Sequence, residues 1–164
     1  MALHLGRIFH ININVTDMER SVAFYESLGF RVCYDFELDD QTMRTTCAAL
    51  GGEPNPHRGV FMTLGDSPTA TIIDLVQWYD PPTGGHVYPT LTDVGMPRLA
   101  FHVDNPMEVY DELKARGIEF LGPVGFGTPP GEGENRSVVF GFRDPDGNVL
   151  EVLGGVEYMA RPPA

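Results

Sequence analysis

Two short segments of the chain carry polar side chains that alternate with apolar residues. His10, Asn12 and Asn14 alternate with isoleucines in the first segment, and Arg98 and His102 occupy alternate positions of the second. Successive side chains of a strand point to opposite faces, so the members of each set share one face. We expect these faces to line a ligand-binding concavity, although a hydrated surface without a ligand fits the same pattern.

Two carboxylates stand at equivalent places near the ends of two similar segments. Asp74 lies between isoleucine and leucine, and Glu151 lies between leucine and valine. Aliphatic neighbours indicate strand positions, where a carboxylate is either an ordinary solvent-facing residue or a functional one. Their matching placement favours a function. The sequence shows no serine or cysteine nucleophile motif, and Gly125–Gly127 lacks the features of a phosphate-binding loop.

An internal repeat explains this matching placement. The segment HININVTDMERSVAFYESLGFRV, which starts at His10, aligns without gaps with RLAFHVDNPMEVYDELKARGIEF, which starts at Arg98, at an offset of 88 residues. The segment that ends in Asp74 and its neighbours resembles the one around Glu151. A repeat of this kind predicts two structural modules that each leave one sheet face bare when alone, so we expect them to share a core or a cavity.

Each copy has the pattern of a strand, a helix and three further strands. Thr16 or Asp17 is suited to cap the first helix, and Asp104 or Asn105 the second, where Pro106 fits the first turn. Gly29 and Gly117 suit the left-handed position after each helix. The expected later strands are 30–36, 60–64, 72–76, 119–121, 137–142 and 149–153, with a short inserted helix over 41–50 and a mobile loop over 122–135.

Composition limits the classes of partner. The chain has 164 residues and a formal net charge of −12, from 23 acidic and 11 basic residues. This charge disfavours nucleic acid and anionic membrane surfaces, because both repel an acidic protein. The sequence predicts no membrane span and no secretory signal, and its two cysteines, Cys33 and Cys47, lack zinc-finger spacing. We expect a cytoplasmic protein with reduced thiols, although a single disulfide stays open.

The motifs of the repeat resemble those of the vicinal-oxygen-chelate superfamily, which includes glyoxalases, bleomycin-resistance proteins and extradiol dioxygenases. They comprise the start His10, Val15 and Asp17, the helix residues Ser21, Phe24 and Tyr25, the turn Leu28, Gly29 and Phe30, and the DPDGNxxE ending from Asp144 to Glu151. The resemblance implies an α+β fold of two βαβββ modules whose curved mixed sheets form a cup. It implies one domain over 1–164, with modules at 7–78 and 96–154 and a linker at 79–95.

The resemblance also implies a site at the first and last strands of each module. Metal-binding relatives place four ligands at the positions of His10, Asp74, Arg98 and Glu151. His10, Asp74 and Glu151 suit a divalent metal such as zinc, nickel, manganese or iron. Arg98 departs from the pattern, because a guanidinium keeps its proton and does not coordinate cations. It would weaken metal binding by repulsion, replace the metal by pairing with a carboxylate, or bind an anionic substrate group.

Three functions follow from the resemblance. The first is a glyoxalase-like lyase or isomerase that acts on a small oxygenated metabolite with or without metal assistance, with Glu151 as the base and Arg98 beside it. The second is a metal-free, drug-sequestering protein of the bleomycin-resistance type, and the third is an extradiol-type dioxygenase, which Arg98 disfavours because that reaction needs two histidines. The expected substrate-binding residues are Asn12, Asn14, Arg98, His102 and Trp78. The resemblance further implies a homodimer, and His4, His57 and His86 are expected at the surface.

Overall fold

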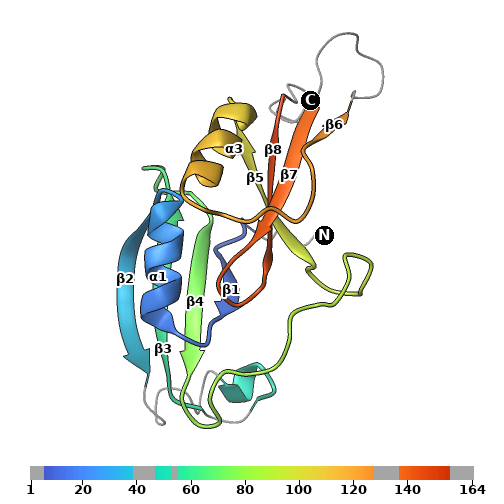
Figure 1. Ribbon diagram of the computed structural model, residues 1–164. Helices are drawn as coiled ribbons and strands as arrows, with labels where there is room; N and C mark the ends of the chain where they lie inside the picture. Colours follow the sequence, from blue (N-terminus) through green and yellow to red (C-terminus); the bar gives the residue numbers. More distant parts are fainter. Residues whose placement is uncertain (1–5, 39–46, 53–54, 128–136, 156–164) are drawn as a thin grey trace, which may run out of the picture. The chain divides into compact units, whose positions relative to one another are not determined.

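The computed structural model describes residues 6–38, 47–52, 55–127 and 137–155 of the chain. These residues form two compact units, Met1–Gly85 and His86–Ala164 (Figure 1). The division falls inside the segment 79–95, which the sequence predicts to be a linker. Each unit has its own four-stranded sheet and its own long helix.

The first unit contains a mixed sheet with one helix packed on it. The strands are β1 (His10–Asn14), β2 (Phe30–Leu38), β3 (His57–Leu64) and β4 (Ile72–Trp78), and the helix is α1 (Met18–Ser27). The sheet order is β1-β4-β3-β2, in which β1 runs parallel to β4 and the other pairs are antiparallel. This arrangement brings the first and last strands of the unit side by side.

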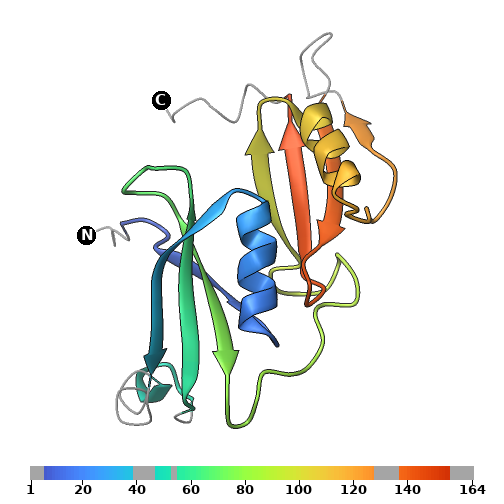
Figure 2. The ribbon, with the colours of Figure 1, turned by 60° about the vertical axis from the view of Figure 1, so that its left-hand side comes forward.

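The second unit repeats this topology. The strands are β5 (Arg98–Val103), β6 (Gly125–Gly127), β7 (Ser137–Arg143) and β8 (Val149–Gly154), and the helix is α3 (Pro106–Ala115). The order β5-β8-β7-β6 again pairs the first strand in parallel with the last. Figure 2 shows each helix lying across the sheet of its own unit. The predicted α+β fold of two βαβββ modules with mixed sheets is confirmed.

One predicted strand is wrong. Residues 119–121 contribute only an isolated bridge, between Phe120 and Phe142, and the first strand after α3 is β6 instead. Gly125 and Gly127 pair with β7 at Val139 and Ser137, at places where an added Cβ would lie only 3.0 and 2.8 Å from the partner side chains. The lack of side chains therefore permits strand pairing inside a segment that the sequence predicts to be a mobile loop. The remainder of that loop, 128–135, lies outside the described residues.

The helix ends follow local capping rules. Asp17 is the N-cap of α1 and accepts a hydrogen bond from the backbone N–H of Arg20 at 3.0 Å, whereas Asn105 caps α3 without a side-chain hydrogen bond. Gly29 and Gly117 follow the helices with φ of 95° and 81°, a region that strongly favours glycine. Both predicted glycine positions are thus confirmed.

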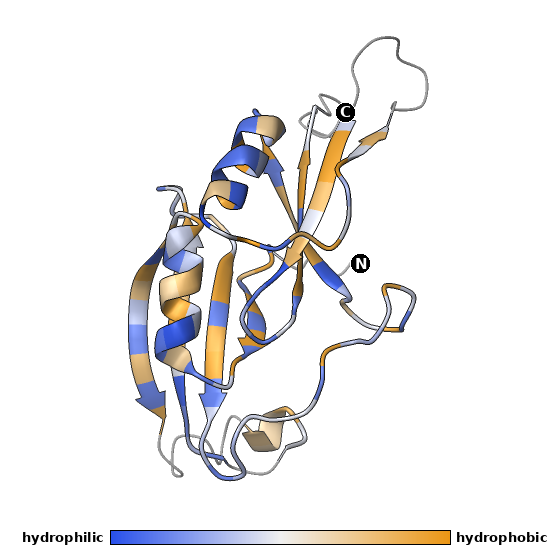
Figure 3. Cartoon of the chain, viewed as in Figure 1, coloured by the Kyte–Doolittle hydropathy of each residue, from blue (hydrophilic) through white to orange (hydrophobic). Residues whose placement is uncertain are grey.

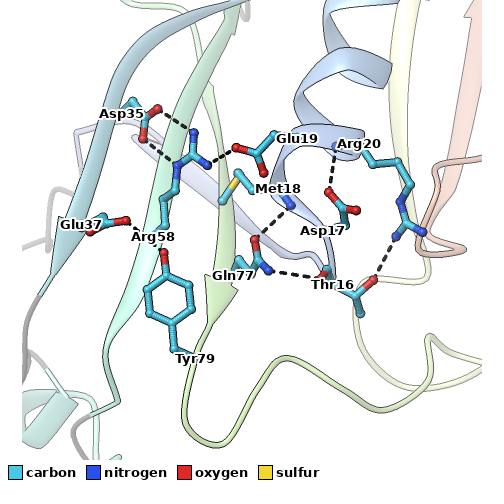
Figure 4. A network of polar contacts seen from close by, with 10 residues as sticks. All are labelled: Thr16, Asp17, Met18, Glu19, Arg20, Asp35, Glu37, Arg58, Gln77 and Tyr79. Atoms are coloured by element: carbon cyan, nitrogen blue, oxygen red, sulfur yellow. Dashed lines mark hydrogen bonds and ion pairs between the residues drawn. The ribbon is translucent and has the colours of Figure 1, made fainter.

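Polar contacts also fix α1 onto the first sheet (Figure 4). The Gln77 side chain on β4 accepts a hydrogen bond from the Met18 N–H at 3.0 Å, which satisfies a free donor of the first helical turn. Arg58 on β3 pairs with Asp35 on β2 and with Glu19 on α1. The pKa values of both carboxyls are lowered, chiefly by the hydrogen bonds from Arg58.

Buried apolar side chains from the strands and the helix form the core of each unit. Figure 3 shows the hydrophobic residues of β4 interrupted by hydrophilic ones, as expected for a sheet with one apolar face. The fully buried side chains of the first unit include Val15, Met18, Tyr25, Met62 and Leu75, and the buried residues of the second include Leu113, Phe140, Phe142, Leu150 and Val152. Burial of each such side chain contributes about 1.5–3 kcal/mol.

Three smaller predictions concern the cysteines, the inserted helix and membrane spans. Cys33 and Cys47 are both free thiols, exposed and buried respectively. Of the helix predicted over 41–50, residues 47–49 are helical and 41–46 lie outside the described residues. No helix within the described ranges is long and apolar enough to cross a membrane.

Candidate functional site

The first half of the predicted site lies on the sheet face opposite α1. Strand pairing aligns Asn12 of β1 with Asp74 of β4, and Asp74 with Phe61 of β3. Phe61 in turn pairs with Tyr34 of β2. Paired residues of neighbouring strands point to the same face, so Asn12, Asp74, Phe61 and Tyr34 form one line across the sheet, here called the Asp74 row.

Asp74 is the buried centre of this row. Its Oδ2 accepts a hydrogen bond from Asn12 Nδ2 at 2.8 Å, and the residue is 5% exposed. Burial raises the pKa of Asp74 to about 6, although the nearby His10 and the Asn12 hydrogen bond each oppose this rise. His10 lies two residues before Asn12 on β1 and therefore on the same face. The structure thus brings the predicted site residues His10, Asn12 and Asp74 together.

Two buried polar atoms on this face lack a hydrogen-bond partner among the described residues. They are Asp74 Oδ1 and His10 Nδ1. A buried acceptor without a partner costs about 1–3 kcal/mol, so such atoms are uncommon in folded proteins and often mark a place that contacts a ligand, an ion or water. The two atoms therefore mark the place in the first unit where hydrogen-bond partners are missing among the described residues.

Aromatic rings surround these two atoms. The Phe61 ring centroid lies 5.7 Å from that of His10, 6.0 Å from that of Phe9 and 5.1 Å from that of Phe36. Tyr34 stacks on Phe36 with 5.4 Å between centroids and 26° between ring planes. Phe9 and Tyr34 are 49% and 60% exposed, so this aromatic group has free ring surface.

The end of the same face contains Trp78. Its indole Nε1 donates to Asn14 Oδ1 at 2.9 Å, so two predicted substrate-binding residues contact each other. His57 lies 4.5 Å from the Trp78 ring and is only 6% exposed, which makes the expectation of a surface His57 wrong. Burial lowers the pKa of His57. Of the other two histidines expected at the surface, His86 is exposed and His4 lies outside the described residues.

The second half of the predicted site contains an ion pair. Arg98 on β5 pairs through Nε with Oε2 of Glu151 on β8, and the two side chains are 45% and 19% exposed. The register aligns Arg98 with Val149 and Ala100 with Glu151, so both charged residues and His102 share one face. The expectation that Arg98 meets a carboxylate is confirmed, and its partner is Glu151.

This ion pair bears on metal binding. The four positions that hold metal in relatives carry His10 and Asp74 in the first unit, and Arg98 and Glu151 in the second. The guanidinium offers no lone pair, and the Glu151 carboxylate is already occupied by it. Among the residues that the structure describes, no group of three or more His, Cys, Asp or Glu side chains is placed to hold a metal ion. In the second unit the donor set fits a divalent ion poorly, because Arg98 has no lone pair to offer and pairs with Glu151.

Two features of the site were not predicted from the sequence. Phe61 and Tyr34 belong to the Asp74 row only through the pairing of β2, β3 and β4, and a register shift between Val32 and Tyr34 interrupts the alternation of β2. His57 is buried because β3 begins there rather than at Val60. Residues His57 to Phe61 do not alternate between polar and apolar types, so the sequence offered no clear signal for this longer strand.

Comparison with known families decides the classification. The family model of the Glyoxalase/Bleomycin resistance protein/Dioxygenase superfamily matches residues 7–152. The chain belongs to this superfamily. The match spans both units, and it includes all four positions of the predicted site.

Solved structures of the superfamily share the fold. A glyoxalase family protein from Bacillus cereus is 21% identical, with a TM-score of 0.73, and the match covers 93% of this chain and 95% of that one. A glyoxalase family protein from Enterococcus faecalis is 23% identical, with a TM-score of 0.62 and coverage of 90% and 96%. The trypanothione-dependent glyoxalase I of Leishmania major is 22% identical, with a TM-score of 0.61 and coverage of 95% and 91%. At these identities the similarity shows the fold alone. The comparison with curated sequences found no match.

Proposed function

We propose that this chain is a metal-free small-molecule binding protein of the bleomycin-resistance type. The observation that carries the proposal is the ion pair between Arg98 and Glu151, at two positions that hold metal ligands in metal-binding relatives. The superfamily includes drug-binding members that need a cavity but no metal. An Arg–carboxylate pair is a self-consistent replacement for a metal, because each charge satisfies the other.

Electrostatics supports this proposal. A guanidinium at about 4–6 Å from a divalent ion would cost several kcal/mol at an effective dielectric of about 20. That cost would act against any metal ion that Glu151 helped to hold, because Arg98 is paired with this carboxylate. The ion pair also has the stability of a charge-assisted hydrogen bond, which a metal would have to break before it could bind Glu151.

The candidate ligand-binding residues come from each of the two units. We propose that the two modules act as one functional domain, with 79–95 as the linker, as the repeat predicts. Asn12, Asn14 and Trp78 would contribute polar and aromatic contacts from the first unit, and Arg98 and His102 from the second. Members of the superfamily commonly form dimers, and a homodimer in the cytoplasm stays a prediction for this chain.

Metal analysis tests the proposal directly. The purified chain is incubated with zinc, nickel, manganese or iron(II), desalted and analysed for bound metal, and we expect clearly less than one ion per chain. Arg98→His removes the repulsive charge and adds a ligand, so we expect it to bind zinc or nickel at least tenfold more tightly by calorimetry. Arg116→His is the matched control, because Arg116 is a similarly exposed arginine paired with Glu112 on α3. Stoichiometric metal in the parent chain, or equal affinities for parent and Arg98→His, would contradict the proposal.

A second function, a glyoxalase-like lyase or isomerase, is favoured by a different observation. The raised pKa of Asp74, a carboxyl with one oxygen without a partner among the described residues, is a feature of a site that exchanges protons near neutral pH. In that case Glu151 and Arg98 would be the catalytic pair that the sequence predicts. Turnover of a compound with vicinal oxygens that is lost on treatment with EDTA would support this function over metal-free binding.

A further inference from the structure

The Asp74 row combines a buried carboxylate with aromatic rings, and this combination restricts the ligand. Asp74 Oδ1 and His10 Nδ1 are both without a partner among the described residues. An ionised carboxylate oxygen is only an acceptor, whereas His10 Nδ1 donates or accepts according to the tautomer of the ring. Asp74 Oδ1 therefore calls for a ligand that donates a hydrogen bond, and a carbonyl or carboxylate group of a ligand does not match it.

The sign of the ligand charge follows from the surroundings of Asp74. Among the residues that the structure describes, the nearby His10 and the Asn12 amide offset the charge of this buried carboxylate. Aromatic faces attract cations, and Phe61 is the direct neighbour of Asp74 on β3. The chain as a whole has a formal net charge of −12, which raises the local concentration of cations. These contributions all favour a positively charged donor.

The shape of the ligand follows from the rings. Tyr34 is 60% exposed and stacks on Phe36. The Phe36 ring lies over Gly59, because a Cβ added at Gly59 would be only 2.3 Å from an atom of this ring. Phe36 thus rests against the β3 backbone, and Tyr34 rests against Phe36. Such a layered arrangement presents a flat aromatic surface beside Phe61, and flat surfaces stack best with planar groups.

We propose that the Asp74 row binds a planar organic cation with N–H donors, such as an amidinium, a guanidinium or a protonated aromatic amine. The cation donates to Asp74 Oδ1, and its planar part stacks on the ring of Phe61, to which the neighbouring Tyr34 ring is inclined by 50°. Because Asp74 Oδ1 is buried, entry of the ligand includes a movement of the half-buried Phe61 ring beside it. The inference rests on the proposed small-molecule binding function and assigns a ligand class to it.

Benzamidine is a suitable probe, because it is planar, aromatic and carries two N–H donor groups on one positive charge. Binding is measured at pH 8 by calorimetry and by NMR shifts, with EDTA present so that no metal competes. Benzamide and benzoate serve as neutral and anionic probes of the same shape. We expect benzamidine to bind the parent chain at least tenfold more tightly than either of them.

Two variants locate the binding. Asp74→Asn removes the charge and keeps an acceptor for Asn12, and we expect it to weaken benzamidine binding at least tenfold, as for loss of a charge-assisted hydrogen bond. Asp66→Asn removes the same charge at an exposed turn, where Asp66 pairs with Arg31, and should leave the affinity unchanged. Phe61→Leu should weaken binding severalfold through loss of stacking.

The outcomes are distinguishable from those of the metal experiment. No benzamidine binding at millimolar concentration, equal binding of benzamide, or equal affinities for parent and Asp74→Asn would each overturn the ligand assignment. A stoichiometric metal ion in the purified chain would instead overturn the metal-free function, whatever the result with benzamidine in EDTA. Weaker benzamidine binding in Asp74→Asn and Phe61→Leu, with unchanged binding in Asp66→Asn, supports the assignment.

Discussion

Replacement of Asp74 by asparagine is expected to stabilise the folded protein at neutral pH. Burial raises the pKa of Asp74 to about 6 in the folded chain, whereas an aspartate in an unfolded chain titrates near about 4. The folded state therefore holds the proton more tightly than the unfolded state does. The contribution of this group to stability is complete below about pH 4 and is lost as the pH rises through about 6.

The magnitude follows from this difference in pKa. A difference of about 2 corresponds to about 3 kcal/mol once both states are ionised. Asparagine carries no charge, and its carbonyl oxygen keeps an acceptor for the hydrogen bond from Asn12. We therefore expect Asp74→Asn to raise the free energy of unfolding by up to about 3 kcal/mol at pH 8 and to change it little at pH 3.5. Such an increase is large against the usual 5–15 kcal/mol of a domain.

Urea denaturation of the parent and the variant, at several pH values between 3.5 and 8 with EDTA present, measures this effect. Asp66→Asn is the charge-matched control, because Asp66 is exposed and its replacement should show no such rise with pH. The reasoning would be refuted by a stability difference that does not depend on pH. It would also be refuted if Asp74→Asn were the less stable protein at pH 8.

Three further predictions concern a close backbone contact, a helix cap and the ion pairs of Arg58. Gly154→Ala places a Cβ 2.6 Å from a backbone oxygen of β5, so we expect a loss of about 1–3 kcal/mol by urea denaturation, against almost none for Gly122→Ala, which meets nothing within 4 Å. Asp17→Ala should cost about 1 kcal/mol through loss of the α1 cap, whereas Asn105→Ala, which removes no side-chain cap bond, should cost less; similar losses would contradict the capping argument. Arg58→Met should reduce the decrease in unfolding free energy that occurs as the pH falls below about 4. The pKa values of its two carboxylate partners are lowered, so protonation of these carboxylates breaks their ion pairs with Arg58 and destabilises the parent chain. If the unfolding free energies of the parent and Arg58→Met decreased equally at acid pH, these ion pairs would not contribute to stability.

The strands and helices could be predicted because they obey local periodicity. Each expected strand that alternates cleanly is present, and pairing with neighbours lengthens it, as in β3, which begins at His57 rather than Val60. The strand β6 could not be predicted, because Gly125–Gly127 has no side-chain pattern and pairs only through backbone contact with β7. Periodicity is a signal of side chains, so it cannot detect a strand that consists mostly of glycine.

The site could be predicted in part for a related reason. The repeat placed His10 with Asp74 and Arg98 with Glu151, because equivalent strands carry equivalent positions. Phe61 stayed unpredicted, since its place beside Asp74 depends on the antiparallel register of β3 against β4. Register is set by pairing between distant segments and not by the pattern within one of them.

The two halves of the repeat differ in the residues beside their matching carboxylates. Asp74 stands between Asn12 and Phe61, whereas the matching Glu151 stands between Ala100 and Gly141. Both neighbours of Glu151 are small, and its carboxylate pairs with Arg98, which lies on the same face two residues before Ala100. The first unit has no such cation beside its carboxylate among the paired neighbours, and Asp74 Oδ1 and His10 Nδ1 have no hydrogen-bond partner among the described residues. The two matching carboxylates therefore differ in chemistry, because one is neutralised by an ion pair and the other is buried beside an aromatic ring.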